Sequence, residues 1–309
     1  MRRYIVIVVV YAVVLLGLGT SGGVGEAGQV RLGVSRAEAG WRVLSRGPMG
    51  VLADGRVVVV SGVRFTVVRF RSKGVVFGYH VVPGDPPTNV SLGPQEGPIN
   101  RFELAAGVVG AFNAGYKMAA KAGGVSVNGV VLSPLLPHLA TASIDRSGDL
   151  KITSGVGGAP GSVAQVQNLN ALVENSKLSQ SVLSTPWYDW GGVVNNQPLQ
   201  PRSGLGVDAN GNVEYVATMS PVSALELAAA LVKAGAVTAM ALDMNPSWPE
   251  IGVETQPEHH PVGFTTTLPG EWANPNRYFS SPGRSFFVVM ARPLHARLYY
   301  GSAGALRNG

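Results

Sequence analysis

Residues 236–248 read AVTAMALDMNPSW, an apolar run that ends in one carboxylate, Asp243, shortly before a turn-forming proline. The run from Ala236 to Leu242 has the length of a buried strand and is short for a helix. In α/β proteins, functional side chains usually lie at the carboxyl ends of the strands. The stretch therefore predicts a buried strand that delivers Asp243 to a functional site.

The residues before this strand predict the rest of a compact unit that begins at Gly204. A turn at residues 208–211 separates two short strands. Ser220-Pro221 then opens a helix, and Ser223 and Glu226 also have the spacing of a capping box. Gly235 is placed to end that helix.

The remaining chain predicts many short strands. Residues 28–98 form a small β-rich N-terminal region, with turns expected at Asp54-Gly55 and Lys73-Gly74. Further hairpins are expected around Asn128-Gly129 and residues 145–149, whereas apolar spacing between residues 162 and 178 favours a helix. We therefore expect an α+β fold, with a mixed β-sheet core and packed helices after the β-rich N-terminal region.

The composition of the 309-residue chain excludes several classes of protein. Only 14% of the residues are charged and 41 are glycine, which favours a compact, strand-rich protein over a charge-rich disordered one. The net charge of +6 favours anionic partners, but no Lys/Arg-rich run indicates nucleic acid. Because cysteine is absent, disulfides, cysteine-bound zinc and a thiol nucleophile are excluded.

The N-terminus has the order of an export signal. Arg2 and Arg3 precede the apolar run 4–18, and small residues follow up to residue 28. We expect residues 1–27 to be a signal peptide or, if uncleaved, a membrane anchor. The protein is then secreted or held at the outer face of the membrane. Beyond residue 98, we expect the main domain to span residues 99–295 and a tail to span 296–309.

Two further polar segments follow apolar runs, as Asp243 does. One is Asn113-Ala114-Gly115-Tyr116-Lys117, and the other begins with Arg202-Ser203-Gly204. Together with Asp243 they supply one amide, two cations and one carboxylate. We expect them to line a single cleft.

These three segments resemble, in order and content, the motifs of bacterial exported members of the phosphodiester glycosidase family. The motifs here are the Asn113 and Arg202 segments and Leu242-Asp243-Met244-Asn245-Pro246, which looks like an actinobacterial form. The resemblance runs from about Arg101 to Pro293. Ala114 stands where the family usually has glycine, and residues 244–246 replace a glycine-rich loop, so the substrate fit is expected to differ.

The resemblance implies the cleavage of a sugar from a phosphodiester. Such a site must stabilise a developing sugar cation and hold the leaving phosphate. Arg202 is the first candidate for the phosphate clamp, because its guanidinium group is a planar fork, and Lys117 is the second. Asp243 is a candidate nucleophile, general base, or ligand of a divalent cation such as Ca²⁺ or Mg²⁺. The sequence does not decide among these roles and shows no other cofactor motif.

Other residues are candidates for contacts with the sugar or the phosphate. Asn113 and Asn245 carry amides that can orient oxygen atoms, and Arg284 matches a basic position of the family. The remaining substrate-binding candidates are Gly115, Ser247 and Trp190. Trp190 belongs to an aromatic cluster, residues 187–190, that either stacks on sugars or fills the core.

Three functions are consistent with these features. The first is an exported bacterial hydrolase that cleaves a sugar-1-phosphodiester bond of an envelope or extracellular glycan. The second is a noncatalytic cell-surface module that binds anionic phosphoglycan through the same cations. The third is an exopolysaccharide assembly factor without a small substrate.

Overall fold

The computed structural model describes residues 40–82, 85, 92–154, 159–191, 197–244, 246–255, 257 and 263–293. The expected export signal and C-terminal tail lie outside these residues, as does Asn245. The described residues all belong to one compact unit. Within the described residues, no helix combines the length and the apolar character needed to cross a bilayer.

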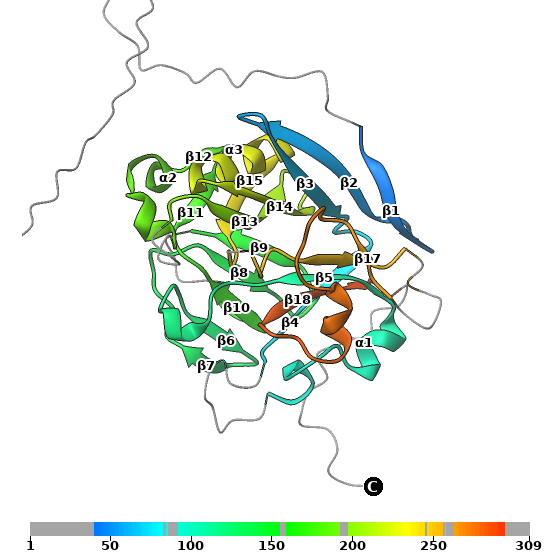
Figure 1. Ribbon diagram of the computed structural model, residues 1–309. Coiled ribbons are helices and arrows are strands. Elements are labelled where there is room, and N and C mark those ends of the chain that lie inside the picture. Colours follow the sequence, from blue (N-terminus) through cyan, green and yellow to red (C-terminus); the bar gives the residue numbers. More distant parts are fainter. Residues whose placement is uncertain are drawn as a thin grey trace, which may run out of the picture. The chain divides into compact units, whose positions relative to one another are not determined.

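The described strands form three sheets (Figure 1). The first has eight strands in the order β1-β2-β3-β14-β13-β15-β11-β12. Its strands are β1 (Arg42–Gly47), β2 (Gly50–Val60), β3 (Val63–Phe70), β11 (Ala171–Glu174), β12 (Lys177–Leu178), β13 (Gln200–Asp208), β14 (Val213–Val222) and β15 (Ala236–Ala241).

The other two sheets have five strands each. The second has the order β7-β6-β10-β8-β9, with β6 (Val125–Val127), β7 (Val130–Ser133), β8 (Thr141–Ile144), β9 (Leu150–Thr153) and β10 (Ala164–Gln167). The third has the order β17-β16-β5-β18-β4, with β4 (Val75–His80), β5 (Val108–Asn113), β16 (Ile251–Val253), β17 (Thr265–Thr266) and β18 (Phe286–Ala291).

Helices are short and few among the described residues. The α-helices are α1 (Arg101–Ala106), α2 (Gln180–Ser184) and α3 (Ala224–Ala234). The 3₁₀ helices include η1 (Gly93–Gln95), η2 (Met118–Ala120), η3 (Trp187–Trp190) and η5 (Pro275–Phe279). The fold contains both helices and sheets, as expected, but it is far richer in strands than a sheet with packed helices.

The expectation of a mixed sheet is wrong for the described strands. Each pair of neighbouring strands is antiparallel, including β13 with β15 and β5 with β18. The described part of the N-terminal region is rich in strands, as expected, because it contains β1 to β4. These strands belong to the first and third sheets. Strand β3 pairs with β14, and β4 pairs with β18.

The predicted unit ending at Asp243 is largely confirmed. Strands β13 and β14 flank the turn at residues 208–211, and Ser223 caps α3 through a capping box with Glu226. Gly235 ends α3 in the left-handed conformation. The prediction that Ser220-Pro221 opens this helix is wrong, because both residues extend β14 and the helix begins only after Ser223.

Two other local predictions are wrong. Residues 162–178 contain β10 and β11 instead of a helix. The strands were not predicted because neighbouring side chains, such as Ala171 and Leu172, are both buried, so the apolar pattern lacks the two-residue period of a half-exposed strand. Asp54-Gly55 lies within β2, where Arg69 and Arg71 hold the Asp54 carboxylate. The turns at Lys73-Gly74, Asn128-Gly129 and residues 145–149 occur as predicted.

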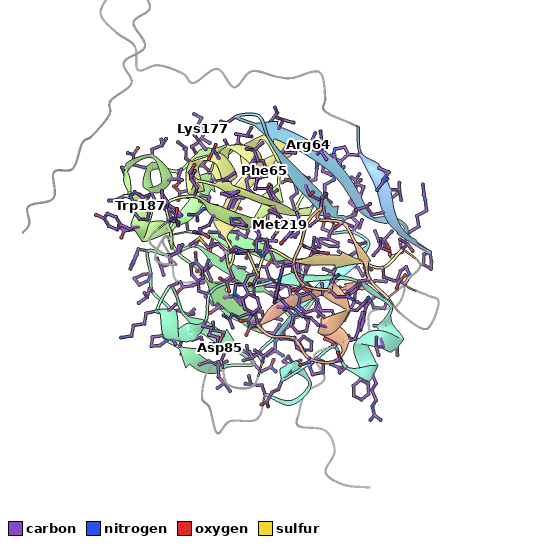
Figure 2. The ribbon with its side chains drawn as sticks, in the orientation of Figure 1. Arg64, Phe65, Asp85, Lys177, Trp187 and Met219 are labelled. Atoms are coloured by element: carbon purple, nitrogen blue, oxygen red, sulfur yellow. The ribbon has the colours of Figure 1, made fainter. Side chains whose placement is uncertain are left out.

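The core explains why the sheets pack closely. Phe70, Phe77, Phe112, Tyr215 and Phe287 are buried in one apolar cluster that also receives side chains from the second sheet. Figure 2 shows side chains filling the space between the ribbons. Such close packing fixes the strand ends relative to one another.

Helix α3 covers one face of the first sheet. A β-carbon on Gly204 would lie 2.9 Å from the Leu231 side chain, and one on Gly206 would lie 2.7 Å from Ala236. These two glycines of β13 therefore allow α3 and the start of β15 to approach the strand directly. The close approach fixes β13 and β15 against α3. It thereby also fixes the positions of Ser203 in β13 and of Asp243, which follows β15.

Candidate active site

The candidate active site forms where β5 of the third sheet meets β13 and β15 of the first. Two backbone hydrogen bonds join the segments: the Leu242 N–H donates to the Ser203 carbonyl at 2.9 Å, and the Asp243 N–H donates to the Ala114 carbonyl at 2.8 Å. Three segments that are far apart in the sequence thus meet at Asp243. This confirms that Asp243 follows a buried strand.

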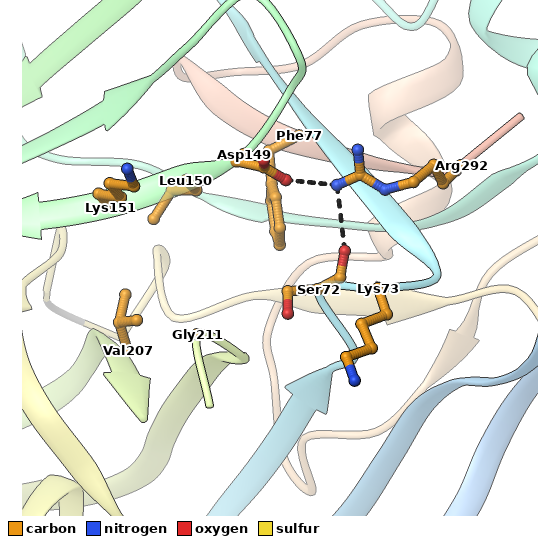
Figure 3. A pocket seen from close by; sticks show the side chains of 9 residues that line it. All are labelled: Ser72, Lys73, Phe77, Asp149, Leu150, Lys151, Val207, Gly211 and Arg292. Carbon is orange, nitrogen blue, oxygen red and sulfur yellow. Dashed lines mark hydrogen bonds and ion pairs between the residues drawn. The ribbon is translucent and has the colours of Figure 1, made fainter. Parts of the chain in front are cut away.

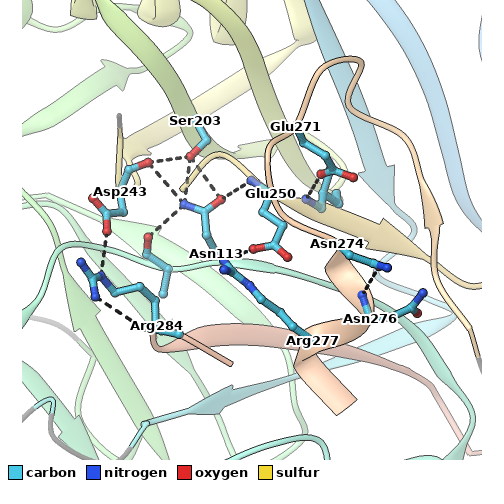
Figure 4. Close-up of polar contacts among 12 residues, drawn as sticks. Asn113, Ser203, Asp243, Glu250, Glu271, Asn274, Asn276, Arg277 and Arg284 are labelled. Atoms are coloured by element: carbon cyan, nitrogen blue, oxygen red, sulfur yellow. Dashed lines mark hydrogen bonds and ion pairs between the residues drawn. The ribbon is translucent and has the colours of Figure 1, made fainter. Parts of the chain in front are cut away.

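Asn113 is the hub of this junction (Figure 4). Its Nδ2 donates to Ser203 Oγ at 3.0 Å and to the Asp243 carbonyl at 3.3 Å. Its Oδ1 accepts from the Tyr215 hydroxyl at 2.8 Å and from the Glu250 N–H at 3.2 Å. Because Asn113 is fully buried, the structure assigns it to positioning Asp243.

The Asp243 carboxylate is almost completely buried, with 4% exposure. Its Oδ1 accepts from the Met244 N–H at 2.8 Å, and its Oδ2 lies 3.4 Å from Arg284 Nε. Burial raises the pKa of Asp243 to about 7, although Arg284 acts in the opposite direction. A carboxyl group with a pKa near neutrality is suited to proton transfer.

Arg284 is held on its other side by an aromatic ring. Its guanidinium carbon lies 3.9 Å from the centroid of the Trp248 ring, and that of Arg277 lies 5.1 Å from the same centroid. Arg277 is in turn paired with the buried carboxylate of Glu250. Trp248 therefore fixes the cation that faces Asp243.

Asp85 is a second buried aspartate in this site, and the sequence analysis missed it. It is 5% exposed, and its Oδ1 accepts from the Met118 N–H at 2.9 Å. Burial raises its pKa, while Arg284 and Lys117 lower it, and its charge in turn raises the pKa of Asp243. The proline-rich sequence around Asp85 indicated only a linker, so no local pattern identified it.

The two predicted cations differ in their surroundings. Lys117 is exposed beside Asp85, as a point charge that a substrate can reach. Arg202 is 2% exposed, and it donates from Nε to the Val222 carbonyl at 3.0 Å and from Nη1 to the Trp190 carbonyl at 2.8 Å. Burial lowers the pKa of Arg202. Arg202 thus anchors η3 to the first sheet.

Gly115 adjoins a buried asparagine that the sequence analysis also missed. Asn168 Oδ1 accepts from the Tyr116 N–H at 3.1 Å, and its Nδ2 donates to the Ala241 carbonyl at 3.0 Å. A β-carbon on Gly115 would lie only 3.0 Å from Asn168 Cβ. The glycine therefore lets the loop after β5 approach Asn168, which links this loop to the end of β15.

The other predicted contacts are partly described. Trp190 is buried and Ser247 is half-buried, whereas Asn245 lies outside the described residues. Among the described residues, no group of three or more His, Cys, Asp or Glu side chains is arranged to hold a metal ion. A divalent cation bound by Asp243 remains a prediction.

A separate hollow of about 410 Å³ lies at the other end of β13 (Figure 3). Val207, which lines it, pairs with Thr238, five positions before Asp243 in β15, so it lies roughly 17 Å along the strand from Asp243. The one carboxylate in its lining, Asp149, is paired with Arg292. The buried carboxylates near Asp243 therefore mark the better candidate for chemistry.

The fold and site together define a β-rich protein with two buried aspartates and a fixed arginine near the junction of two sheets. Residues 103–243 match the phosphodiester glycosidase family. The resemblance predicted from the motifs is thus confirmed over this part of the chain, which ends at Asp243. The match indicates a hydrolase that acts on phosphodiester-linked sugars.

The comparison with solved structures found chains of low sequence identity, and one of them has a TM-score above 0.5. The catalytic domain of zebrafish N-acetylglucosamine-1-phosphodiester alpha-N-acetylglucosaminidase, auto-inhibited by its pro-peptide, is similar with a TM-score of 0.52 and 13% identity, over 84% of this chain and 88% of that chain. A hypothetical protein from Synechocystis is similar with a TM-score of 0.44 and 14% identity, over 78% of this chain and 62% of that chain. No curated protein matches in sequence.

Proposed function

We propose that this protein is an exported hydrolase that cleaves a sugar-1-phosphodiester bond of an envelope or extracellular glycan. The observation that carries the proposal is the buried Asp243 carboxylate, which faces Arg284 and is influenced by the charge of Asp85. It lies within the region that matches the phosphodiester glycosidase family. A perturbed carboxylate with a cation beside it is a frequent feature of catalytic sites.

Electrostatic stabilisation of the leaving phosphate is the first requirement of this reaction. The phosphate leaves as a monoester anion, so nearby cations can stabilise the developing negative charge without a proton being transferred to the phosphate. Arg284 and Lys117 are the described cations that act on Asp85 in this site. We assign them the contact with the phosphate, and Arg202 the indirect role of holding η3.

Proton transfer is the second requirement. In the proposed step, a water oxygen bonds to the anomeric carbon while the bond from this carbon to the phosphate oxygen breaks, and its electron pair leaves on the phosphate. The proton of the water passes to the Asp243 carboxylate. A pKa of about 7 suits this role as general base, because the ionised form is available and still basic near neutral pH.

Asp85 has a separate role in this proposal. Its carboxylate is held by the Met118 N–H, so its position is fixed beside Lys117. Negative charge there stabilises the positive charge that develops on the sugar ring. It also raises the pKa of Asp243, which makes Asp243 a stronger base.

The envelope setting of the substrate rests on charge and on the N-terminus. The net charge of +6 favours anionic glycans. The charged and apolar segments at residues 2–18 have the order of an export signal. A glycan outside the membrane is therefore the substrate class that we propose.

The direct test is incubation of the purified protein with an N-acetylglucosamine-1-phosphodiester, followed by analysis of both products. Hydrolysis should give free sugar and a phosphate monoester, which phosphorus NMR distinguishes from the diester. Parallel reactions with Ca²⁺, Mg²⁺ or a chelator test the metal-ligand role of Asp243. Failure to cleave any of a panel of sugar-1-phosphodiesters would contradict the proposal.

A further inference from the structure

The hollow at the far end of β13 brings together residues from all three sheets (Figure 3). Phe77 comes from β4 of the third sheet, Leu150 from β9 of the second and Val207 from β13 of the first. The β3–β4 turn supplies Ser72 and Lys73. The volume of about 410 Å³ lies within the range of about 300–1,000 Å³ that is typical of small-molecule sites. The hollow is therefore large enough for a sugar that carries charged substituents.

Arg292 fixes one wall of the hollow. Its Nη2 donates to the Ser72 carbonyl at 3.1 Å and to the Val75 carbonyl at 2.9 Å, and its Nη1 donates to the Ser147 carbonyl at 3.3 Å. The same guanidinium group is paired with Asp149. Arg292 thus joins the β3–β4 turn to the turn before β9, and its own charge is balanced within the protein.

A second set of contacts ties the β3–β4 turn to the β13–β14 turn. The Ser72 N–H donates to Asn212 Oδ1 at 3.3 Å. The Asn212 N–H and Nδ2 donate to the Asp208 carboxylate, each at 2.8 Å. A β-carbon on Gly211 would lie 3.7 Å from Ser72 Oγ, so the two turns are in contact. The walls are therefore fixed before a ligand binds, which lowers the entropic cost of binding.

The inner surface of the hollow is apolar. Phe77 and Leu150 are almost fully buried, with 1% and 4% exposure, whereas Val207 is half-buried and presents accessible apolar surface. The Phe77 ring packs edge-on against Phe70, with centroids 6.2 Å apart, so the inner wall is continuous with the core. Ligand sites commonly combine such apolar walls with a few polar groups at fixed positions. The C–H face of a sugar ring suits this surface.

Two lysines provide the unbalanced charge of the hollow. Lys73 and Lys151 are exposed, and neither forms an ion pair with another described residue. Figure 3 shows them on opposite sides of the lining. The one carboxylate in the lining, Asp149, is already paired with Arg292. The two lysines therefore leave an excess of positive charge on each side of the apolar surface, which favours an anionic ligand.

We propose that the hollow is a second binding site, which holds an internal sugar unit of a phosphodiester-linked glycan without cleaving it. An internal unit of such a chain carries one phosphate on each side of the sugar ring. This pattern matches one lysine on each side of an apolar surface. The sugar ring lies against Val207, and the phosphate oxygens accept hydrogen bonds from Lys73 and Lys151. The choice of a phosphoglycan as ligand rests on the proposed function.

The position of the hollow makes the proposed substrate a polymer. Val207 lies roughly 17 Å along the strand direction from Asp243. A single sugar phosphate is too short to fill both places, whereas a chain of several units can bind at both. Binding at the hollow keeps the rest of the chain close to the candidate active site and raises its effective concentration there.

Methyl NMR of the full-length protein locates the binding, with a hexose 1,6-bisphosphate as the probe. The signals of Leu150 and Val207 should shift, with an affinity about tenfold higher than for a hexose 1-phosphate, because the second phosphate adds a charge-assisted contact. Met244, whose N–H donates to Asp243, reports binding at the candidate active site in the same spectra. Unshifted Leu150 and Val207 signals at millimolar probe, or equal affinity for the two probes, would overturn the second site.

Removal of the two lysines tests the contribution of charge. Lys73→Ala with Lys151→Ala should weaken bisphosphate binding, followed at Leu150 and Val207, by about tenfold or more. The matched control is Arg64→Ala with Lys177→Ala, which removes two exposed cations that do not line the hollow. The control should bind as the wild type does. An equal loss in both double variants would show only a general attraction between the protein and anions, and would overturn the site.

Val207→Phe tests the shape of the hollow while both lysines remain. The larger side chain fills part of the space that the sugar ring is proposed to occupy, so the affinity for the bisphosphate should fall several-fold. A thermal midpoint close to that of the wild type confirms that the variant is folded. A folded Val207→Phe protein that binds the bisphosphate as tightly as the wild type would place the ligand outside the hollow and overturn the proposal. The lysine variants provide a test that does not depend on packing.

Kinetics separate a failure of the second site from a failure of the proposed function. The Lys73→Ala, Lys151→Ala variant should raise KM for a phosphodiester-linked polymer several-fold and leave kcat and the cleavage of a short diester unchanged. Cleavage of the short diester by a protein whose Leu150 and Val207 signals do not respond to the bisphosphate would overturn the second site alone. A response of these signals without cleavage of any diester would overturn the proposed function and leave a sugar-phosphate site in the hollow.

Discussion

Asp243 Oδ2 lies 3.4 Å from Arg284 Nε, and the same guanidinium group lies over the ring of Trp248. The arginine is thus fixed between an anion and an aromatic face. Burial and Arg284 act on the Asp243 carboxyl in opposite directions, and burial is the larger effect. The pKa of about 7 that results is the property from which the first prediction follows.

Two substitutions should shift the pH profile in opposite directions. Asp85→Asn removes a negative charge that raises the pKa of Asp243, so this pKa should fall. Arg284→Gln removes a cation that lowers it, so the pKa should rise. Because the general base acts when deprotonated, the acid limb of kcat/KM, near pH 7 in the wild type, should move to lower pH in the first variant and to higher pH in the second.

Carboxyl NMR of Asp243 can follow the same shifts independently of activity. Shifts of the Asp243 pKa in the same direction for both variants would contradict the electrostatic account of this site. An acid limb that stays in place while the Asp243 pKa moves would instead show that another group is the base.

Arg202 and Lys117 should respond differently to loss of charge. Arg202→Met leaves the buried Val222 and Trp190 carbonyls without their donor and should cost roughly 2–3 kcal/mol of stability. Lys117→Met changes an exposed side chain, so the stability should stay within about 0.5 kcal/mol while KM rises. Denaturant unfolding and steady-state kinetics measure both. A stable Arg202→Met protein with weaker phosphate binding alone would restore Arg202 as a direct phosphate clamp.

Gly191→Ala should destabilise the protein more than Gly211→Ala. Both glycines have a φ of +79°, so both substitutions carry the same backbone strain, about 1 kcal/mol. A β-carbon at Gly211 would meet only Ser72 Oγ at 3.7 Å, whereas one at Gly191 would lie 2.0 Å from the Tyr116 hydroxyl. The additional clash should add roughly 1–3 kcal/mol. Equal losses of unfolding free energy would show that Tyr116 does not pack against Gly191.

Glu214 should make the stability depend on pH at a place remote from catalysis. Burial raises its pKa to about 8, with Asp208 adding to the rise and Arg69 opposing it. Between its unfolded pKa, near 4.5, and about 8 the folded state binds more protons, so this group makes stability fall as pH rises.

Glu214→Gln removes this ionisation and should behave like the protonated wild type. The variant should match the wild type at pH 5 and exceed it by roughly 2–4 kcal/mol at pH 9, since each pKa unit corresponds to about 1.4 kcal/mol. Thermal unfolding at several pH values measures the difference. A stability difference that does not change with pH would contradict the raised pKa.

The sequence predicted elements whose signals are local. The capping box of Ser223 and Glu226, the left-handed Gly235 and the turn at residues 208–211 each depend on neighbouring residues, and each occurs as predicted. The buried strand before Asp243 was equally clear from its apolar run. Local chemistry thus located the best-defined unit of the fold.

Other features depend on partners that are distant in the chain. Asp54-Gly55 has the sequence of a turn, but Arg69 and Arg71 bind the aspartate within a strand pair. The segment at residues 162–178 becomes two strands because neighbouring strands are available on both sides of β10. Sheet pairing outweighed the local pattern in both cases.

The residues of the candidate site also divide into those with a local sequence signal and those that depend on distant partners. Asp243 was predicted from its position after a strand, and Arg284 from a family motif. The charge of Asp85 acts on Asp243, but Asp85 comes from a proline-rich segment without a local signal. Asn168 comes from a segment that the sequence assigned to a helix. Their contributions depend on the packing of three sheets, which no local pattern specifies.

The most direct measurement is sugar release from an N-acetylglucosamine-1-phosphodiester by the wild type and by Asp243→Asn, with substrate binding measured in parallel. The account predicts that the variant retains binding and loses kcat by about 10²-fold or more, because the general base is missing. Sugar release that is unchanged in a folded variant would contradict the central claim. Binding without release in the wild type would identify a noncatalytic glycan-binding protein instead.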